Sequence, residues 1–307
     1  MGVPPAIDDI AAQISLTPYQ ALGIPLALFG AVFLALGAQF QHRGVAKVEA
    51  SHGSGAKAGL SIRELRALLG RPSWVVGTVM LGLAIVLQLA SLRIAPLLVV
   101  QPLGAIALVI TSIVNARATK TPLDGLAIRA IALCIGGVGV FVAIAAFTAT
   151  ERPIREPQLL IILSVLAVVT VVLGTVFLMK RRSANAIFYI LAAGVLYGFV
   201  ATLAKVVLNR IFTGNFEWLT MLCIVALLAA AALGAYFVQT AYSVGSPDLV
   251  IAGLTVVDPI VAVSIGIVVL GEAAQAPLLA MIAFLVAGAV AVIGVFQLAK
   301  HHPQTVR

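Results

Sequence analysis

Nine runs of about 20 apolar residues each dominate the sequence and limit what it can fold into. A run of this length crosses a bilayer as an α-helix, because every backbone amide and carbonyl must find its partner inside the segment where no water is present. Continuous apolar runs also differ from the short alternating strands of a membrane barrel. The sequence therefore predicts an all-α integral membrane protein with nine transmembrane helices. The predicted spans are residues 21–40, 74–92, 95–114, 126–147, 159–179, 187–208, 218–242, 249–270 and 277–298.

The distribution of basic residues predicts how these spans are oriented. Only 10% of the residues are charged, and 14 of the 19 Lys and Arg side chains fall in the connections and tail on one side of the predicted spans, against four on the other. Basic connections are retained in the cytoplasm, so we expect the N-terminus outside and the C-terminus inside the cell (inner) membrane. The formal charge of +8 then reflects topology, and the expected surroundings are a lipid bilayer rather than nucleic acid.

The connections divide the chain into two units of four predicted helices. Residues 1–20 form an extracytoplasmic segment, and residues 21–147 form the first unit, with a cytoplasmic loop at 42–72 that is expected to hold a short helix at 61–69. Residues 148–183 supply a linker and the fifth helix. Residues 184–299 form the second unit, and 300–307 form a cytoplasmic tail.

The two units align with each other when Val99 is placed on Val256. This alignment pairs Gln101-Pro102 with Asp258-Pro259, a polar residue followed by proline inside an apolar run. Because a single helix separates the units, they enter the membrane from opposite sides and form a predicted inverted repeat. Inverted repeats are typical of secondary transporters, which open alternately to the two faces of the membrane. A duplicated scaffold that moves nothing is the alternative.

Five polar side chains inside the predicted spans are the candidate substrate-binding residues. Asp258 and Lys205 are ionisable, and such groups cost at least about 2.5 kcal/mol each to insert, so they usually face a cavity or a partner. Gln88 and Gln101 are expected to share a depth with Lys205, and Tyr197 can line the same cavity. The alternatives are that Lys205 extends to the outer interface and that Asp258 makes a bond between helices. If the protein binds a metal, Asp258 is the expected ligand.

No other acidic residue is expected deep inside a span, and no pair of acids is expected at one depth. The four His residues lie outside the spans without metalloprotease spacing, and neither a Walker loop nor a dinucleotide-binding motif occurs. Cys134 and Cys223 each lie within an apolar run, so a disulfide framework is not expected. We therefore expect a protein that is not an enzyme and that has no cofactor.

Two sets of motifs resemble known transporter families. Tyr197-Gly198 followed by Lys205, and the Leu270-Gly271-Glu272 ending, resemble the EamA-type helices of the drug/metabolite transporter (DMT) superfamily. The chain is also similar to the NIPA-like branch, which is named for magnesium transporters. That similarity rests on the segments at 41–44 and 95–105, on Lys205, and on Gln239 with Tyr242. The resemblance implies a transporter fold, although Asp258 departs from the NIPA pattern.

Four functions remain open at the level of the sequence. The first is a secondary transporter of a small metabolite or drug-like solute, in which Asp258 binds a cation or proton and Lys205 attracts an anionic group. The second is a magnesium transporter, which the positive charge of Lys205 opposes. The third is a translocase for a lipid-linked carrier, with Lys205 holding its phosphate. The fourth is a non-transporting membrane scaffold. A homodimer is one possible assembly.

Overall fold

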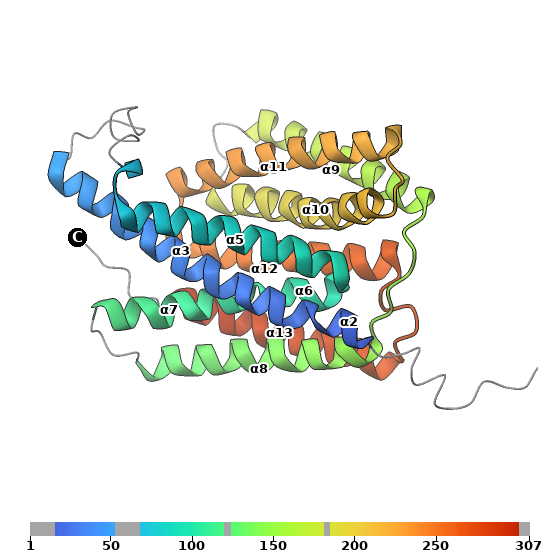
Figure 1. Cartoon of the computed structure of the whole chain (residues 1–307), viewed down its shortest axis with the longest axis horizontal. Helices are drawn as coiled ribbons and strands as arrows, with labels where there is room; N and C mark the ends of the chain where they lie inside the picture. The colour runs from blue at the N-terminus through green and yellow to red at the C-terminus, as the bar shows by residue number, and fades with distance from the viewer. Residues whose placement is uncertain (1–15, 53–67, 120–123, 181–184, 301–307) are drawn as a thin grey trace, which may run out of the picture.

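The computed structural model describes residues 16–52, 68–119, 124–180 and 185–300, and their secondary structure is helical (Figure 1). Within these ranges, nine helical segments are long and apolar enough to cross a membrane. This confirms the predicted helical class and the number of spans. The chain is a multi-pass membrane protein.

The helices follow one another as a bundle of antiparallel crossings. In chain order they are α2 (Pro18–Ala21), α3 (Gly23–His52), α5 (Pro72–Ile94), α6 (Leu97–Leu103), α7 (Ala105–Thr119), α8 (Gly125–Thr148), α9 (Glu156–Lys180), α10 (Ala186–Phe212), α11 (Trp218–Val244), α12 (Pro247–Ile265), the π-helix η1 (Gly266–Leu270) and α13 (Leu278–Lys300).

Local sequence explains where several of these helices begin. The side chain of Asp124 accepts a hydrogen bond from the amide of Ala127 at the start of α8, and Asn185 caps α10 in the same way. Pro72 occupies the first turn of α5, where its missing N–H leaves no hydrogen bond unmade. These signals lie at the polar borders of the apolar runs, so the predicted spans begin close to the observed helices.

Two spans contain a proline and an irregular stretch of backbone. The predicted span 95–114 is two helices, because α6 ends at Leu103, directly after Pro102, and α7 begins at Ala105. In α12, Pro259 lies inside the helix, and the span ends in the π-helical turn η1. A proline removes one backbone hydrogen bond and crowds the preceding turn, which accounts for the break after Pro102. Helix α12 continues through Pro259, and its π-helical turn begins only at Gly266.

The close packing of the bundle depends on glycine at helix crossings. The most extensive contacts join α3 to α5, α8 to α13, and α10 to both α11 and α12. A Cβ atom on Gly198 would lie 2.6 Å from Cβ of Val261 on α12, and a Cβ on Gly137 would lie 2.5 Å from the backbone of Ala291 on α13. Small residues therefore let these backbones approach, as is usual between membrane helices.

The two predicted units have matching neighbours. In the first unit α3 packs on α5 and on α6 and α7, and in the second α10 packs on α11 and α12. The last helices of the two units, α8 and α13, pack against each other, while α9 lies at the periphery beside α10 and α11 (Figure 1). This arrangement agrees with a repeat, but the two-fold axis in the membrane plane remains a prediction.

The connection predicted at 42–72 needs a correction. Helix α3 continues to His52, so the first part of this segment is helical rather than a loop. The helix predicted at 61–69 lies outside the described residues, except for Leu68 and Leu69, which are helical.

Candidate functional site

A polar cavity of about 410 Å³ lies between α3, α5, α10, α12 and the junction of α6 with α7. Its apolar walls come from α3 and α5, including Leu34 and Ile85. Its polar side chains are Gln88 on α5, Gln101 on α6, Tyr197 on α10, and Thr255 and Asp258 on α12. The structure thus brings together four of the five predicted site residues. We refer to this space as the Asp258 cavity.

Asp258 is the charged group of this cavity, and no described residue pairs with its Oδ1 atom. It lies near the middle of the span Leu249–Leu270, and its Oδ1 atom is buried without a hydrogen bond. No salt bridge of Asp258 is found in the part of the chain that the structure describes. Buried carboxylates in membranes are normally paired, so one that faces a cavity without a partner is a strong candidate for binding a ligand. The alternative that Asp258 bonds to another helix is not what the described residues show.

Two other polar groups of the cavity, Gln101 and Tyr197, are closely packed. Gln101 directly precedes Pro102 in the short helix α6 and is only 6% exposed. The ring of Tyr197 packs on Gly234 of α11, where a Cβ atom would lie 2.9 Å from it. The Tyr197 ring can occupy this position because Gly234 has no side chain.

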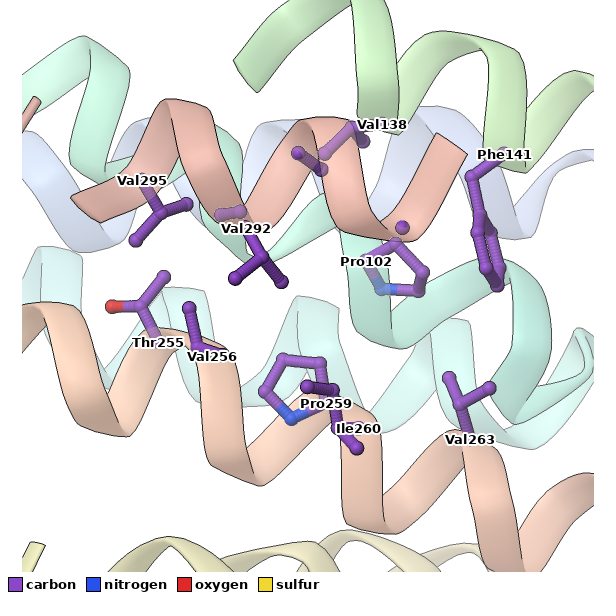
Figure 2. Close-up of a pocket in the computed structure, with 13 residues that line it drawn as sticks. Pro102, Val138, Phe141, Thr255, Val256, Pro259, Ile260, Val263, Val292 and Val295 are labelled. Atoms are coloured by element: carbon purple, nitrogen blue, oxygen red, sulfur yellow. The ribbon is translucent and has the colours of Figure 1, made fainter. Parts of the chain in front are cut away.

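A second, smaller cavity lies on the other side of the α6 and α12 prolines (Figure 2). It measures about 90 Å³ and is lined by apolar side chains from α8 and α13, including Phe141 and Val292. Pro259 and Thr255 line both cavities. The helix segment that carries Asp258 is thus flanked by unfilled space on two sides, which leaves it room to shift.

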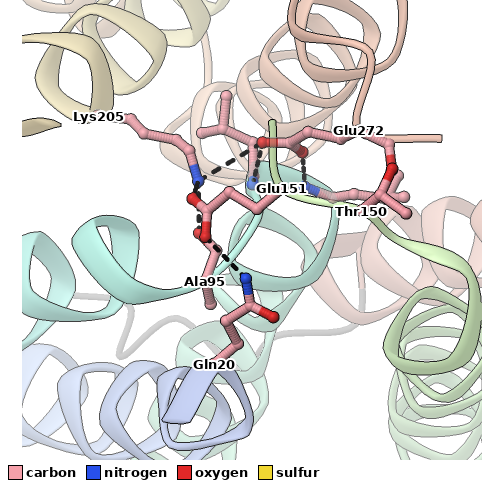
Figure 3. Close-up of polar contacts among 8 residues, drawn as sticks. Gln20, Ala95, Thr150, Glu151, Lys205 and Glu272 are labelled. Atoms are coloured by element: carbon pink, nitrogen blue, oxygen red, sulfur yellow. Dashed lines mark hydrogen bonds and ion pairs between the residues drawn. The ribbon is translucent and has the colours of Figure 1, made fainter. Parts of the chain in front are cut away.

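Lys205 does not line the Asp258 cavity. Its ammonium group donates to Oε1 of Glu151 at 2.7 Å and to the carbonyl of Ala95 at 2.7 Å, and it lies 3.6 Å from Oε1 of Glu272 (Figure 3). The side chain of Gln20 donates to the other oxygen of Glu151 at 3.0 Å. We call these five residues the Lys205 cluster, and the end of the bundle that holds them the Lys205 end. Lys205 is 3% exposed, so it does not extend to the membrane surface either.

Glu272 is the functional candidate that the sequence interpretation missed. It is 2% exposed, and its carboxylate accepts hydrogen bonds from the amides of Leu97 at 2.9 Å and Leu98 at 2.8 Å, at the start of α6. Its backbone carbonyl accepts from the amide of Thr150 at 2.7 Å. Burial raises the pKa of Glu272 above its ordinary value, while the Lys205 ammonium and the two amides act in the opposite direction.

The expectation that no two acids share a depth is therefore wrong. Glu151 and Glu272 both contact Lys205, although each lies in a connection rather than in a predicted span. The signal in the sequence was the Leu270-Gly271-Glu272 ending. Gly271 has φ of 72°, a backbone conformation that favours glycine. The chain turns at this residue, and the turn places the Glu272 carboxylate at the start of α6.

The metal-binding potential of the described residues is small. Within the described ranges, no three His, Cys, Asp or Glu side chains lie close enough together to hold a metal ion. Cys134 and Cys223 are free and buried. The side-chain oxygen atoms around the Asp258 cavity come from one carboxylate, two amides, one phenol and the hydroxyl of Thr255.

Comparison with known proteins adds one relative. The chain is 29% identical over 267 residues to an uncharacterized protein of Corynebacterium glutamicum, an alignment that covers 83% of this chain and 86% of the relative. No protein-family model matches the chain, and no solved structure matches it.

Proposed function

We propose that the protein is a secondary transporter that moves a small solute by alternating access, with the Asp258 cavity as its solute site. The observation that carries this proposal is the carboxylate of Asp258, which lies near the middle of a membrane span and faces a cavity of about 410 Å³, with its buried Oδ1 atom making no hydrogen bond to the described residues. A volume of this size suits a small molecule. An open cavity with an unpaired charge also opposes a scaffold role, because sealed packing would be expected there.

The charge of the cavity narrows the solute class. Lys205 is occupied by two carboxylates and a carbonyl, so the described cavity lining contains one acid and no base. Such a site favours a cation, or a neutral solute that travels with a proton on Asp258, over an anion. The same observation removes the reason for a lipid-linked carrier, which depended on Lys205 holding a phosphate.

The Lys205 cluster supports the alternating-access part of the proposal. It ties α10 to the end of α5, the connection before α9 and the connection after η1, while Glu272 also holds the start of α6. Gln101, Asp258 and Tyr197 lie on α6, α12 and α10, so the cluster joins the elements that bear the cavity residues. We interpret the cluster as a closed gate at the Lys205 end, which the basic-residue distribution predicts to be extracytoplasmic.

Membership of the DMT superfamily, closest to the NIPA-like branch, is part of this proposal and rests on the motifs given above. A NIPA-type magnesium transporter is the second candidate, because the cavity presents oxygen ligands from Asp258, Gln88 and Gln101. A single carboxylate is a weak set for Mg²⁺, so the solute transporter is preferred.

The test is uptake into proteoliposomes under an imposed pH gradient, with amines, amino acids, sugars and Mg²⁺ as separate probes. We expect uptake of an amine or a neutral solute, and a loss of at least about tenfold in Asp258→Asn, which keeps the shape but not the charge. Glu156→Gln is the matched control, because Glu156 is an exposed carboxylate at the start of α9. If Asp258→Asn transports as well as the parent protein at every pH, Asp258 is structural and the site assignment fails.

A further inference from the structure

A third, apolar space of about 690 Å³ lies at the Lys205 end, outside the Asp258 cavity. It is bounded by α2 and the first turns of α3 on one side, by the last turns of α5 on another, and by the end of α10. We call it the Arg93 groove. Its principal walls are Tyr19, Phe29, Leu89, Arg93, Leu208 and Phe212.

Arg93 is the charged side chain of this groove. Its guanidinium lies 3.8 Å from the centre of the Phe212 ring, so one face is occupied by the aromatic ring. The side chain is exposed, and no carboxylate pairs with it in the part of the chain that the structure describes. The N–H groups at the edge of the guanidinium therefore remain available, and their planar arrangement matches a phosphate.

The groove has the length and position of a lipid chain in one leaflet. Arg93 lies in the last turn of its span, at the depth where head groups begin, and Tyr19 lies at the start of another. Phe29 follows Tyr19 by ten residues, which is about 15 Å along a helix and half of a bilayer core of about 30 Å. Phe29 is 59% exposed, so the groove faces the surroundings of the bundle.

We propose that the Arg93 groove binds an acidic phospholipid, with its phosphate on the edge of Arg93 and one acyl chain along the groove toward Phe29. A single unpaired cation at the head-group end of an apolar groove is complementary to a lipid that carries negative charge at one end only. This inference goes beyond transport, since the lipid occupies a space other than the Asp258 cavity.

The groove adjoins the Lys205 cluster along three elements. Tyr19 precedes Gln20 of the cluster, Arg93 lies two residues before Ala95, and Leu208 lies about one helical turn from Lys205. Leu89 lines both the groove and the Asp258 cavity. The bound lipid therefore holds α2, α5 and α10 together behind the cluster and stabilises the arrangement in which the Lys205 end is closed.

The experiment compares a phosphatidylglycerol with a phosphatidylcholine of the same acyl chains. The full-length protein in detergent is mixed with each lipid, and the retained lipid is measured by native mass spectrometry together with the melting temperature. We expect several-fold greater retention of phosphatidylglycerol, and a rise in melting temperature that phosphatidylcholine does not produce. Arg93→Gln should lose this preference, and Arg93→Lys should keep part of it, because a lysine retains the charge but not the planar edge.

Arg155→Gln is the matched control, because Arg155 is also exposed at the Lys205 end but does not line the groove. It should bind like the parent protein. The proposal is overturned if both lipids are retained equally by the parent, if Arg155→Gln loses the preference as strongly as Arg93→Gln, or if a dimer mass replaces the lipid-bound monomer. Because lipid retention is measured without transport, its failure would leave the assignment of the Asp258 cavity untouched.

Discussion

Asp258 and Lys205 lie on the adjacent helices α12 and α10. They differ in the number of side chains and carbonyls that pair with their charge, and this difference determines whether the charge is available to a ligand. Lys205 is surrounded by two carboxylates and a carbonyl, so its charge is compensated and held in place. Asp258 has no partner among the described residues, so its charge is available to a ligand. For these two residues, the neighbouring groups separate a structural role from a ligand-binding role, and depth in the membrane alone does not.

Replacing Lys205 by Met should strongly destabilise the protein. The substitution keeps the apolar stem but leaves the buried Glu272 without its cation, and removing one partner of a buried ion pair costs about 3–5 kcal/mol. Adding Glu272→Gln in the same chain should recover part of this loss, because the amide carries no charge. The measurement is the melting temperature of each purified variant.

Glu151→Gln provides the comparison, since the side chain of Glu151 is 24% exposed and water can replace its contact. It should cost clearly less than Lys205→Met. If Lys205→Met melts at the temperature of the parent, the cluster does not hold the Lys205 end together, and its interpretation as a gate is lost.

At the scale of elements, α10 and α12 form the contact that supports the Asp258 cavity. A Cβ atom on Gly194 would lie 2.6 Å from Cβ of Val257, and Gly198 would meet Val261 at the same distance. Val257 and Val261 flank Asp258 along α12, so the two glycines set how close the carboxylate lies to Tyr197 of α10. Pro102 of α6 and Pro259 of α12 also line the space that contains Phe141 and Val292.

Gly198→Ala should lower the melting temperature and weaken solute uptake. Overpacking of this kind typically costs about 1–3 kcal/mol, and here it pushes α12 and Asp258 away from α10. Gly174→Ala on α9 is the control, because nothing lies within 4 Å of its added methyl group, and alanine favours a helix over glycine by up to about 1 kcal/mol. Equal effects of the two substitutions would contradict the packing argument.

At the scale of the whole molecule, the nine crossings give the two ends of the bundle different chemistry. The Lys205 end holds a buried cluster of charges, and the opposite end carries the start of α8, the start of α10 and the end of α3. Because α9 is a single crossing between the two predicted units, we expect these units to be inverted relative to each other. In the proposed alternating-access mechanism the two ends open in turn, so their assignment to the two sides of the membrane decides on which side the closed Lys205 end lies.

Single cysteines at the two ends test this assignment. Asn215, in the exposed turn between α10 and α11, and Ser246, between α11 and α12, lie at opposite ends. In intact cells an impermeant thiol reagent should label Asn215→Cys and should label Ser246→Cys only after permeabilisation. Background from Cys134 and Cys223 should be low, since both are 0% exposed. Labelling of Ser246→Cys alone in intact cells would reverse the predicted orientation.

The sequence by itself determined the helical class, the nine spans and the set of polar residues inside them. These are local properties, because a run of about 20 apolar residues predicts a crossing whatever surrounds it, and a polar residue within the run is conspicuous for the same reason. The serine and threonine hydroxyls are a further case. Thr111, Ser112 and Ser264 each donate to the carbonyl four residues earlier in their own helix, as is usual for a hydroxyl inside an apolar helix.

Only the tertiary structure decided which polar residues meet. Gln88, Gln101, Tyr197 and Asp258 come from four helices, and nothing local distinguishes them from Lys205, which faces elsewhere. Glu272 lies in a short connection beyond its span, and the amides of Leu97 and Leu98 that bind it are 175 and 174 residues away in the sequence. The strength of an electrostatic interaction depends on distance and on exclusion of water, and both are fixed only when distant segments pack together.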